Sequence, residues 1–338
     1  MSLTGQHWAP INTVEKTKAK IILSIVSPLY NEEGNVQPLI ERINAAVFPL
    51  GVSYEIILVD DGSQDSTWDA ISTVCVENEI VVGIQLSRNF GHQHALLAGL
   101  SAARGRAIVS LDGDLQHPPE SIPKMFDLWR KGYEIVHTKR YDKEVASLFK
   151  RLSSKLFYRF FSAMTNVILH RGSSDFRLLD RKVLDTILTF KDIDLFFRGA
   201  VQWVGFKATT LPFDAEARFS GTTKYSLRKM LKFALSAIIS FSTIPLKISI
   251  YIGFLTTLLA SIEIIYILIV YLLDYTVPGW ASIMGIISFL FGIMFINLGI
   301  IGIYLARIHE SSQHRPRFIV SEVLVSPQKG DGCDGFNS

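Results

Sequence analysis

The sequence has few cysteines and few charged residues for its length of 338 residues. The two cysteines, Cys75 and Cys333, stand far apart, which excludes a small fold held together by disulfides. Charged residues make up 19%, against roughly 25% in an average soluble domain. The formal net charge of +3 is too small to indicate a nucleic-acid partner, and we expect none. Hydrophobic residues make up 49%, which excludes disorder over most of the chain.

Two common nucleotide-binding patterns are also missing. No G-x-G-x-x-G follows the first predicted strand, and no G-x-x-x-x-G-K-[ST] occurs in the chain. Dinucleotide-binding and P-loop folds are therefore disfavoured. The N-terminal residues lack the apolar stretch of a secretory signal, so we expect no signal peptide.

The hydrophobic residues gather in two long runs near the C-terminal end. Ile248–Leu273 contains Glu263 as its only charged residue, and Trp280–Leu305 contains none. Each run exceeds the about 20 residues that a helix needs to cross a bilayer, which predicts a transmembrane hairpin over residues 246–306. Two buried core helices are the alternative, which apolar residues on every helix face disfavour. Glu263 is either a functional intramembrane group or a helix–helix contact, and the lack of a cationic partner favours the contact.

Basic residues flank the predicted hairpin on both outer sides, whereas its linker, residues 274–279, has no lysine or arginine. Because basic flanks stay in the cytoplasm, we expect a multi-pass protein of the inner (plasma) membrane with both termini and the remaining domain cytoplasmic. A single hairpin leaves much intramembrane surface uncovered, which favours a homo-oligomer.

The first half of the chain alternates short β-rich runs with helix-length amphipathic segments. Strands are predicted at Ile21–Ser27, Tyr54–Val59, Ile80–Leu86, Ala107–Leu111 and Glu134–His137. Helices are predicted at Asn35–Val47, Ser66–Glu77, His92–Ala103 and Pro119–Arg130. This alternation predicts an α/β fold with a mostly parallel sheet. Ligands bind at the carboxyl ends of the strands in such sheets, which indicates a nucleotide-type site there.

Acidic residues follow the second and fourth predicted strands, as Asp60-Asp61 and Asp112-Gly113-Asp114. Gly113 should let the backbone turn sharply, so that both neighbouring carboxylates aim into one cleft. Two carboxylates suit Mg²⁺ or Mn²⁺. Phosphate oxygens and water would complete the coordination of the ion. Asp-Gly is also a common turn dipeptide, so a simple polar turn is the alternative.

Six stretches resemble the family 2 glycosyltransferases with a GT-A (Rossmann-like) fold. They are Pro28-Leu-Tyr-Asn-Glu32, Val59-Asp-Asp-Gly-Ser-Gln-Asp-Ser-Thr67, Ser87-Arg-Asn-Phe-Gly-His-Gln93, Asp112-Gly-Asp-Leu-Gln116, Ser174-Asp-Phe-Arg-Leu178 and Arg218-Phe-Ser-Gly-Thr-Thr-Lys-Tyr225. They follow the family order, and with the hairpin they resemble the polyisoprenyl-phosphate branch. That branch includes dolichol-phosphate mannose synthase and the bactoprenol glucosyltransferases.

The resemblance implies roles for residues on the donor side. Pro28, Tyr30 and Glu32 would line the nucleotide pocket. Asp61 would contact the base, and Asp60 would support the same loop. The resemblance to the bactoprenol branch favours uridine as the base and glucose as the sugar.

The resemblance also implies the residues of the reaction centre. Asp112 and Asp114 would hold Mg²⁺ or Mn²⁺ and the donor diphosphate, Gln116 would lie near the sugar, and Asp175 would lie at the reaction centre. Ala215 departs from relatives that carry larger side chains there. The Gln-x-x-Arg-Trp motif of processive synthases is absent, which disfavours polymer synthesis.

Basic and amphipathic segments indicate the acceptor side. Residues 156–168 carry an apolar stripe that packs either on the core or on the membrane. A second stripe leads into the first span and predicts a juxtamembrane helix over residues 226–245. The candidates for binding a lipid phosphate are Arg140, Arg151, Ser154, Arg218 and Lys224. Unspecific attraction to anionic headgroups is the alternative for each.

Together with these observations, the resemblance implies an enzyme that transfers one sugar, with inversion, from a UDP-sugar to undecaprenyl or another polyprenyl phosphate. A GDP-mannose-dependent transferase and a membrane-anchored nucleotide-sugar binding protein without turnover are the alternatives. The expected domains are an N-terminal extension (1–20), a cytoplasmic GT-A domain (21–225), the juxtamembrane helix, the hairpin and a cytoplasmic tail (307–338).

Overall fold

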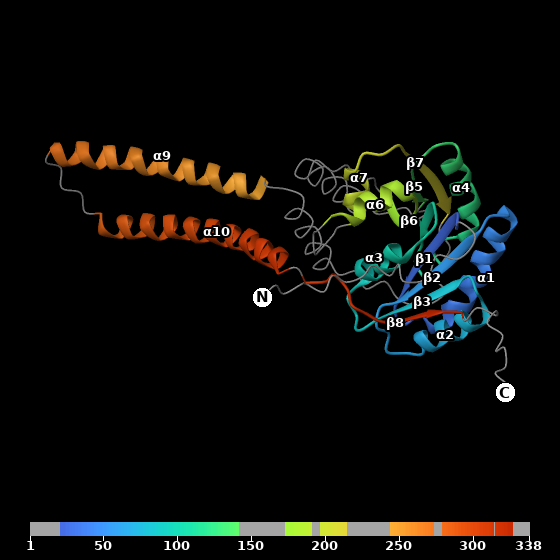
Figure 1. Ribbon diagram of the computed structural model, residues 1–338. Coiled ribbons are helices and arrows are strands. Elements are labelled where there is room, and N and C mark those ends of the chain that lie inside the picture. The colour runs from blue at the N-terminus through green and yellow to red at the C-terminus, as the bar shows by residue number, and fades with distance from the viewer. Residues whose placement is uncertain are drawn as a thin grey trace, which may run out of the picture. The chain divides into compact units, whose positions relative to one another are not determined.

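The computed structural model describes residues 21–141, 173–190, 197–214, 244–273, 279–313 and 315–326. These residues belong to two compact units, a sheet domain and a pair of long helices (Figure 1). Some predicted features lie outside the described residues, namely the extension at 1–20, the stripe at 156–168, Ala215 and most of the juxtamembrane helix.

The sheet domain is built on an eight-stranded sheet with the order β7-β5-β6-β4-β1-β2-β3-β8. The predicted strands are confirmed as β1 (Leu23–Leu29), β2 (Tyr54–Asp60), β3 (Val81–Leu86), β4 (Ala107–Ser110) and β5 (Ile135–Tyr141). Strands β1 to β4 run parallel, which confirms the mostly parallel α/β sheet. Most of their side chains are apolar and buried, as is typical of strands covered by helices on both sides.

Two strands on the β4 side of the sheet were not predicted. Strand β6 (Ser173–Asp180) lies antiparallel between β4 and β5, and β7 (Ala208–Asp214) pairs in parallel with β5. Strand β6 carries charged residues among its apolar ones, which hides the β pattern. Its insertion makes the sheet mixed on this side.

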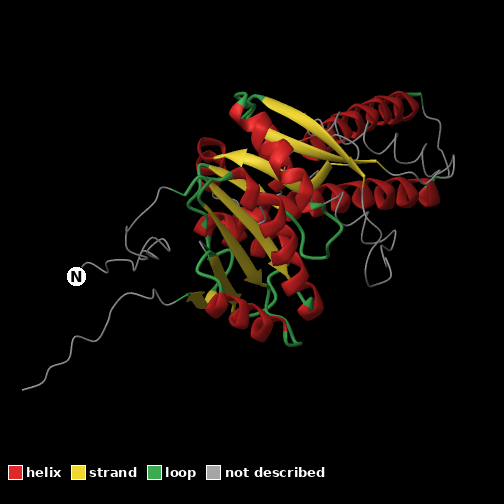
Figure 2. Cartoon of the chain, turned by 90° about the vertical axis from the view of Figure 1, so that its right-hand side faces the viewer, coloured by secondary structure: helices red, strands yellow, loops and turns green. Residues whose placement is uncertain are grey.

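Helices cover both faces of the sheet (Figure 2). One core cluster includes side chains of α1 (Val36–Val47), α2 (Thr67–Glu77) and α4 (Ile122–Arg130). The opposite cluster includes α3 (His92–Ala102), α6 (Arg181–Leu188) and α7 (Phe197–Trp203). Three short 3₁₀ helices accompany them, η1 (Glu33–Asn35), η2 (Phe48–Leu50) and η3 (Pro119–Ser121). The first four predicted helices are confirmed within one or two residues, η3 and α4 together forming the fourth.

The last strand of the sheet comes from the C-terminal segment. Strand β8 (Val320–Val325) pairs antiparallel with β3, and the Ser87 amide donates to the Ile319 carbonyl at 2.9 Å. This segment was expected only as part of a cytoplasmic tail, without a strand. Its backbone instead covers the β3 edge, which would otherwise carry unpaired donors and acceptors.

The second unit consists of α9 (Ile244–Leu272) and α10 (Trp280–Ser312), which contact each other. By length and composition, Leu246–Glu263 and Phe289–Ala306 are apolar enough to cross a membrane. Only 6% and 0% of these two windows are buried, whereas a core helix of a soluble domain would be mostly buried. The alternative of two core helices is therefore disfavoured.

Helix α3 packs closely on the sheet at Gly99, and a substitution there tests this contact. A Cβ atom at Gly99 would lie 2.4 Å from Cγ1 of Val26 and 2.8 Å from Cγ2 of Val59. We expect Gly99→Ala to destabilise the sheet domain by about 1–3 kcal/mol, seen as a lower unfolding temperature. Gly34→Ala is the matched control, because nothing lies within 4 Å of its Cβ position. Equal unfolding temperatures for the two variants would contradict this packing.

Candidate active site

The predicted donor residues lie at the carboxyl ends of β1 and β2. Pro28 belongs to β1, and Tyr30 follows the strand with 41% of its surface exposed. The Glu32 amide donates to Oγ1 of Thr67 at 2.9 Å, and its carboxylate accepts from the Asn35 side chain. The structure thus brings Pro28, Tyr30 and Glu32 to one edge of the sheet, beside the start of α2.

Hydrogen bonds fasten the loop after β1 to the loop after β2. Asn31 has a left-handed φ of 55°, and its amide donates to Oγ of Ser63 at 2.9 Å. The Gln64 amide donates a hydrogen bond to Oδ1 of Asn31 at 2.9 Å. The side chain of Asn31 thereby supports a backbone conformation that few residues adopt.

Asp60 and Asp61 are buried, with 0% and 2% of their surface exposed. Oδ1 of Asp60 accepts from the Ser63 amide at 3.1 Å, which holds the turn after β2. The Asp61 carboxylate accepts from the amides of Phe90 and Gly91 at 2.8 and 2.9 Å. Burial raises the pKa of Asp61, although both backbone bonds oppose the shift.

The loop after β4 holds Asp112 and Asp114. The Asp112 amide donates to Nδ1 of His117 at 3.0 Å, and Oδ1 of Asp114 accepts from the Gln116 amide at 3.1 Å. Gly113 lies in a turn, as expected, but its φ is not positive.

The left-handed residue of this loop is Leu115, with φ of 60°. Gly113 is needed for space instead, since a Cβ atom there would lie 2.3 Å from Cδ2 of Leu29. The close approach of the loop to the end of β1 is therefore what requires a glycine.

The register of β6 against β4 brings Asp175 to the same loop. Ser110 pairs with Arg177, so the antiparallel register continued by two residues sets Asp112 opposite Asp175. Oγ of Ser110 donates to the Asp175 carbonyl at 2.5 Å. The unpredicted strand β6 thus delivers a carboxylate beside the predicted pair.

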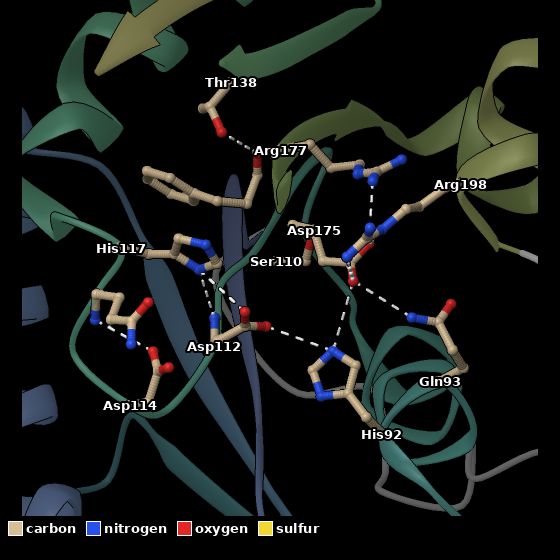
Figure 3. A network of polar contacts seen from close by, with 12 residues as sticks. His92, Gln93, Ser110, Asp112, Asp114, His117, Thr138, Asp175, Arg177 and Arg198 are labelled. Carbon is tan, nitrogen blue, oxygen red and sulfur yellow. Dashed lines mark hydrogen bonds and ion pairs between the residues drawn. The ribbon is translucent and has the colours of Figure 1, made fainter. Parts of the chain in front are cut away.

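The Asp175 carboxylate is 3% exposed and lies among several donors (Figure 3). Nε and Nη2 of Arg198 bind its two oxygens at 2.8 and 2.7 Å, and Nη2 of Arg177 lies 3.1 Å from Oδ1. Nε2 of Gln93 donates to Oδ2 at 3.3 Å. Two arginines therefore compensate one buried carboxylate.

His92 stands between the two acidic groups (Figure 3). Its Nε2 lies 3.4 Å from Oδ1 of Asp112 and 3.6 Å from Oδ2 of Asp175. Burial lowers the pKa of His92, but the bond to Asp175 and the charge of Asp112 outweigh it, so the pKa is raised. The first residue of α3 thus contacts both carboxylates.

His117 supports the Asp112 loop from the other side. Its ring stacks on Phe176 with centroids 5.3 Å apart and meets Phe213 edge-on at 5.9 Å. Burial lowers the pKa of His117, although the charge of Asp112 opposes the shift. A neutral ring leaves Nδ1 able to accept the Asp112 amide proton.

Electrostatics distinguish the Asp175 carboxylate from that of Asp112. Burial would raise the pKa of Asp175, but hydrogen bonds from Arg198 and His92 hold it well below the usual range. Burial raises the pKa of Asp112, and the charges of His117 and His92 only partly offset this. Asp175 is therefore a charged group held by direct hydrogen bonds, whereas burial disfavours the charged form of Asp112.

The residues at this loop fit a divalent cation that shares its ligands with a substrate. Oδ1 of Asp112 is buried and accepts no hydrogen bond from the described residues. The described chain contains no cluster of three or more metal-ligating side chains, so a protein-only cage is not formed there. Mg²⁺ commonly takes one or two carboxylates and completes its shell with phosphate and water. Asp112 and Asp114 suit that mode.

Most of the predicted acceptor residues fall outside the described residues, namely Arg151, Ser154, Arg218 and Lys224. Arg140 belongs to β5, where its backbone pairs with Phe213. The acceptor side of the site therefore stays a prediction.

Five side chains of the cluster were not named as site residues from the sequence. They are His92, Gln93, His117, Arg177 and Arg198. Three of them, His92, Gln93 and Arg177, belong to the stretches that resemble the family. Their membership in these stretches was a signal that could have identified them as site residues. His117 directly follows one stretch, whereas Arg198 belongs to none and is found only through the packing of α7.

The fold and this cluster agree with the comparison to known families. The family model described as glycosyl transferase family 2 matches residues 24–188. An uncharacterised glycosyltransferase of Synechocystis sp. is 40% identical over 304 residues, which cover 90% of this chain and 96% of that protein. The chain therefore belongs to glycosyltransferase family 2, and its sheet domain is a GT-A fold.

Relatives with more specific names match over nearly their whole length. A prophage bactoprenol glucosyl transferase homolog of Escherichia coli K12 is 34% identical, with 89% of this chain and 99% of that protein covered. The bactoprenol glucosyl transferase of Shigella phage SfV is 33% identical, with 88% and 97% covered. The resemblance to the bactoprenol branch is thereby confirmed.

Solved structures with a similar chain course include a mannosyltransferase from Pyrobaculum calidifontis in complex with GDP-Man and Mn²⁺. It has a TM-score of 0.47 and 18% identity, and the match covers 69% of this chain and 65% of that one. Glucosyl-3-phosphoglycerate synthase from Mycobacterium tuberculosis has a TM-score of 0.46 and 18% identity, with 66% and 80% covered.

The pairing of Asp175 predicts a pH-dependent loss of stability in Arg198→Gln. At pH 7 the variant should be less stable by about 1–3 kcal/mol, because a buried charge loses two hydrogen bonds. The pKa of Asp175 is lower in the folded chain than its ordinary value of about 3.9. The charged carboxylate therefore stabilises the folded state fully at a pH above that ordinary value. This stabilisation is lost as the pH falls through the lowered pKa. The measurement is thermal unfolding of both proteins at pH 7 and at stepwise lower pH. The difference in stability between the unaltered chain and Arg198→Gln should become smaller as the pH falls.

The control for this experiment is Arg130→Gln, which removes an exposed arginine from α4. It should leave the unfolding temperature nearly unchanged at every pH. If Arg198→Gln matches this control at pH 7, the Asp175–Arg198 pair does not stabilise the folded chain.

Proposed function

We propose that the chain transfers one sugar, with inversion, from a nucleotide-sugar to a polyprenyl phosphate. UDP-glucose is the proposed donor and undecaprenyl phosphate the proposed acceptor. Relatives named bactoprenol glucosyl transferase, 33% and 34% identical over nearly their full length, support this choice. The class of enzyme, a family 2 glycosyltransferase, is established by the comparisons above.

The state of Asp175 is the observation that carries the proposed acceptor. Its carboxylate is buried, is bound by Arg177 and Arg198, and has a pKa held well below the usual range. Such a group is a poor general base for a sugar hydroxyl, whose proton must be removed. A phosphate monoester has a second pKa near ~6 and arrives mostly as a dianion. The site therefore suits an acceptor that needs no deprotonation.

Positioning and charge compensation would then provide the catalysis. Asp112 and Asp114 would hold Mg²⁺ or Mn²⁺, which when bound offsets the charge of the departing nucleoside diphosphate. Pro28, Tyr30 and Glu32 would line the nucleotide, and Gln116 would lie near the sugar. Asp175 would orient groups at the reaction centre.

The acceptor phosphate would be bound by Arg140, Arg151, Ser154, Arg218 and Lys224. Arginine offers a planar fork that matches phosphate oxygens. We place the reaction on the cytoplasmic face of the inner (plasma) membrane, with α9 and α10 as the multi-pass anchor and a homo-oligomer as the assembly. Basic flanks and the apolar composition of both helices support this placement.

The direct test is the formation of lipid-linked sugar. Purified full-length protein in detergent receives undecaprenyl phosphate, Mn²⁺ and labelled UDP-glucose or GDP-mannose in separate reactions. We expect metal-dependent labelling of the lipid with one sugar from UDP-glucose. Labelling from GDP-mannose alone would replace the donor, and labelled polymer would indicate a processive synthase. Binding of UDP-glucose without any transfer to the lipid would favour a nucleotide-sugar binding protein.

Substitutions test the roles proposed for Asp112 and Asp114 and the role proposed for Asp175. Asp112→Asn and Asp114→Asn should each lower transfer by at least about 100-fold, because charge compensation of the leaving group is lost. Asp175→Asn should also lower transfer, through misplacement of the groups around it. The measurement is the initial rate over a Mn²⁺ titration. Near-full turnover of Asp175→Asn would mean that Asp175 has no role at the reaction centre.

A further inference from the structure

Asp61 contacts the backbone of another loop with both carboxylate oxygens. Oδ1 accepts the Phe90 amide at 2.8 Å and Oδ2 accepts the Gly91 amide at 2.9 Å. The Asp61 amide donates to the Leu29 carbonyl at 2.9 Å, which fixes the residue to the end of β1. Only 2% of the residue is exposed. The carboxylate thus faces the protein interior and the loop at residues 87–91.

The same two loops touch through their backbones. Gly62 has a φ of +65°, and a Cβ atom there would lie 2.5 Å from the carbonyl carbon of Arg88 and 2.7 Å from the amide nitrogen of Asn89. Only glycine fits this approach. The other end of the loop is tied by the Ser87 amide to the Ile319 carbonyl. The course of residues 87–91 is therefore set mainly by contacts from outside the loop.

Helix α3 begins directly after the residues that Asp61 holds. Gly91 is its N-cap, with φ of +98°, and His92 and Gln93 are its first residues. Nε2 of His92 lies 3.4 Å from Oδ1 of Asp112, and Nε2 of Gln93 lies 3.3 Å from Oδ2 of Asp175. The two backbone amides held by Asp61 therefore belong to the two residues directly before His92 and Gln93.

We propose that Asp61 is a positioning residue, which holds the start of α3 so that His92 and Gln93 stay against Asp112 and Asp175. This role is separate from the base contact that the resemblance implies, because each carboxylate oxygen can accept a second hydrogen bond. The inference deepens the proposed function and depends on it only for the effect on turnover.

The test is a comparison of binding and turnover in Asp61→Asn. The amide keeps one acceptor oxygen and sets an NH₂ donor against a backbone N–H, so one of the two bonds is lost. We expect kcat for transfer to fall by about tenfold or more, because small misplacements at a reaction centre are costly. The Kd of UDP is measured separately by calorimetry with Mn²⁺, and kcat is taken at saturating donor, so that a change in donor binding does not enter kcat. A raised Kd with kcat unchanged would overturn the proposal and support a base contact.

Asp127→Asn is the matched control, because it makes the same chemical change at an exposed position of α4. Its kcat and its Kd for UDP should equal those of the unaltered chain. A loss of turnover in both variants would show that the effect of Asp61→Asn is not specific to the loop.

Hydrogen exchange gives a readout that needs neither turnover nor a stable variant. In the unaltered chain, the Phe90 and Gly91 amides should exchange slowly, because a buried carboxylate holds them. In Asp61→Asn, faster exchange should be confined to residues 87–93. Rapid exchange at both amides of the unaltered chain would overturn the proposal. If the unaltered chain forms no lipid-linked sugar from any donor, the proposed function fails, whereas the exchange of these amides still decides the role of Asp61.

Discussion

The ion pairs of the Asp175 carboxylate with two arginines are the interaction on which the site depends. A buried carboxylate without partners would take up a proton or destabilise the fold. Arg177 comes from the same strand and Arg198 from α7, so the pair also ties the helix to the sheet. Because the charge of Asp175 is compensated, an anionic substrate can approach this side of the site. Asp112 and Asp114 then remain as the pair suited to a cation.

The geometry of the sheet explains how these groups meet. Three parallel strands, β1, β2 and β4, end at one edge, and the loops that follow them, including the Asp112 loop, lie there. Strand β6 runs in the opposite direction, so its beginning lies at that edge and carries Asp175. Helix α3 starts at the same edge and adds His92 and Gln93. A site of this kind needs both strand directions, which a purely parallel sheet does not offer.

The sequence was sufficient for the parallel part of the fold and for the position of Asp61 and Asp112 after β2 and β4. Runs such as Ile56–Val59 are continuously apolar, which is typical of a strand buried on both faces. Strand β6 was missed because its functional charges, Asp175 and Arg177, interrupt the apolar pattern. Strand β8 was missed because short β-rich runs form only against a partner, and that partner lies far away in the sequence.

The site was predicted less completely than the fold, for a related reason. A motif indicates which residues gather, but not which atoms they bind. Asp61 stands in a stretch associated with nucleotide binding, yet its oxygens are bound by two backbone amides. Arg198 belongs to no quoted stretch, and its partner is a residue 23 positions earlier in the chain. Long-range pairs of this kind depend on packing, which the sequence alone does not specify.

The position of β8 near the end of the chain determines when the sheet can be completed during protein synthesis. The strand follows both long helices, and it covers the edge of β3, which is made some 240 residues earlier. While a ribosome makes the chain, that edge therefore stays open until both helices have left the exit tunnel. The sheet domain can collapse early around β1 to β4, but its border closes last. An exposed strand edge is a site for unwanted pairing between chains. Early capture of the apolar helices by a membrane would keep nascent chains apart during this interval.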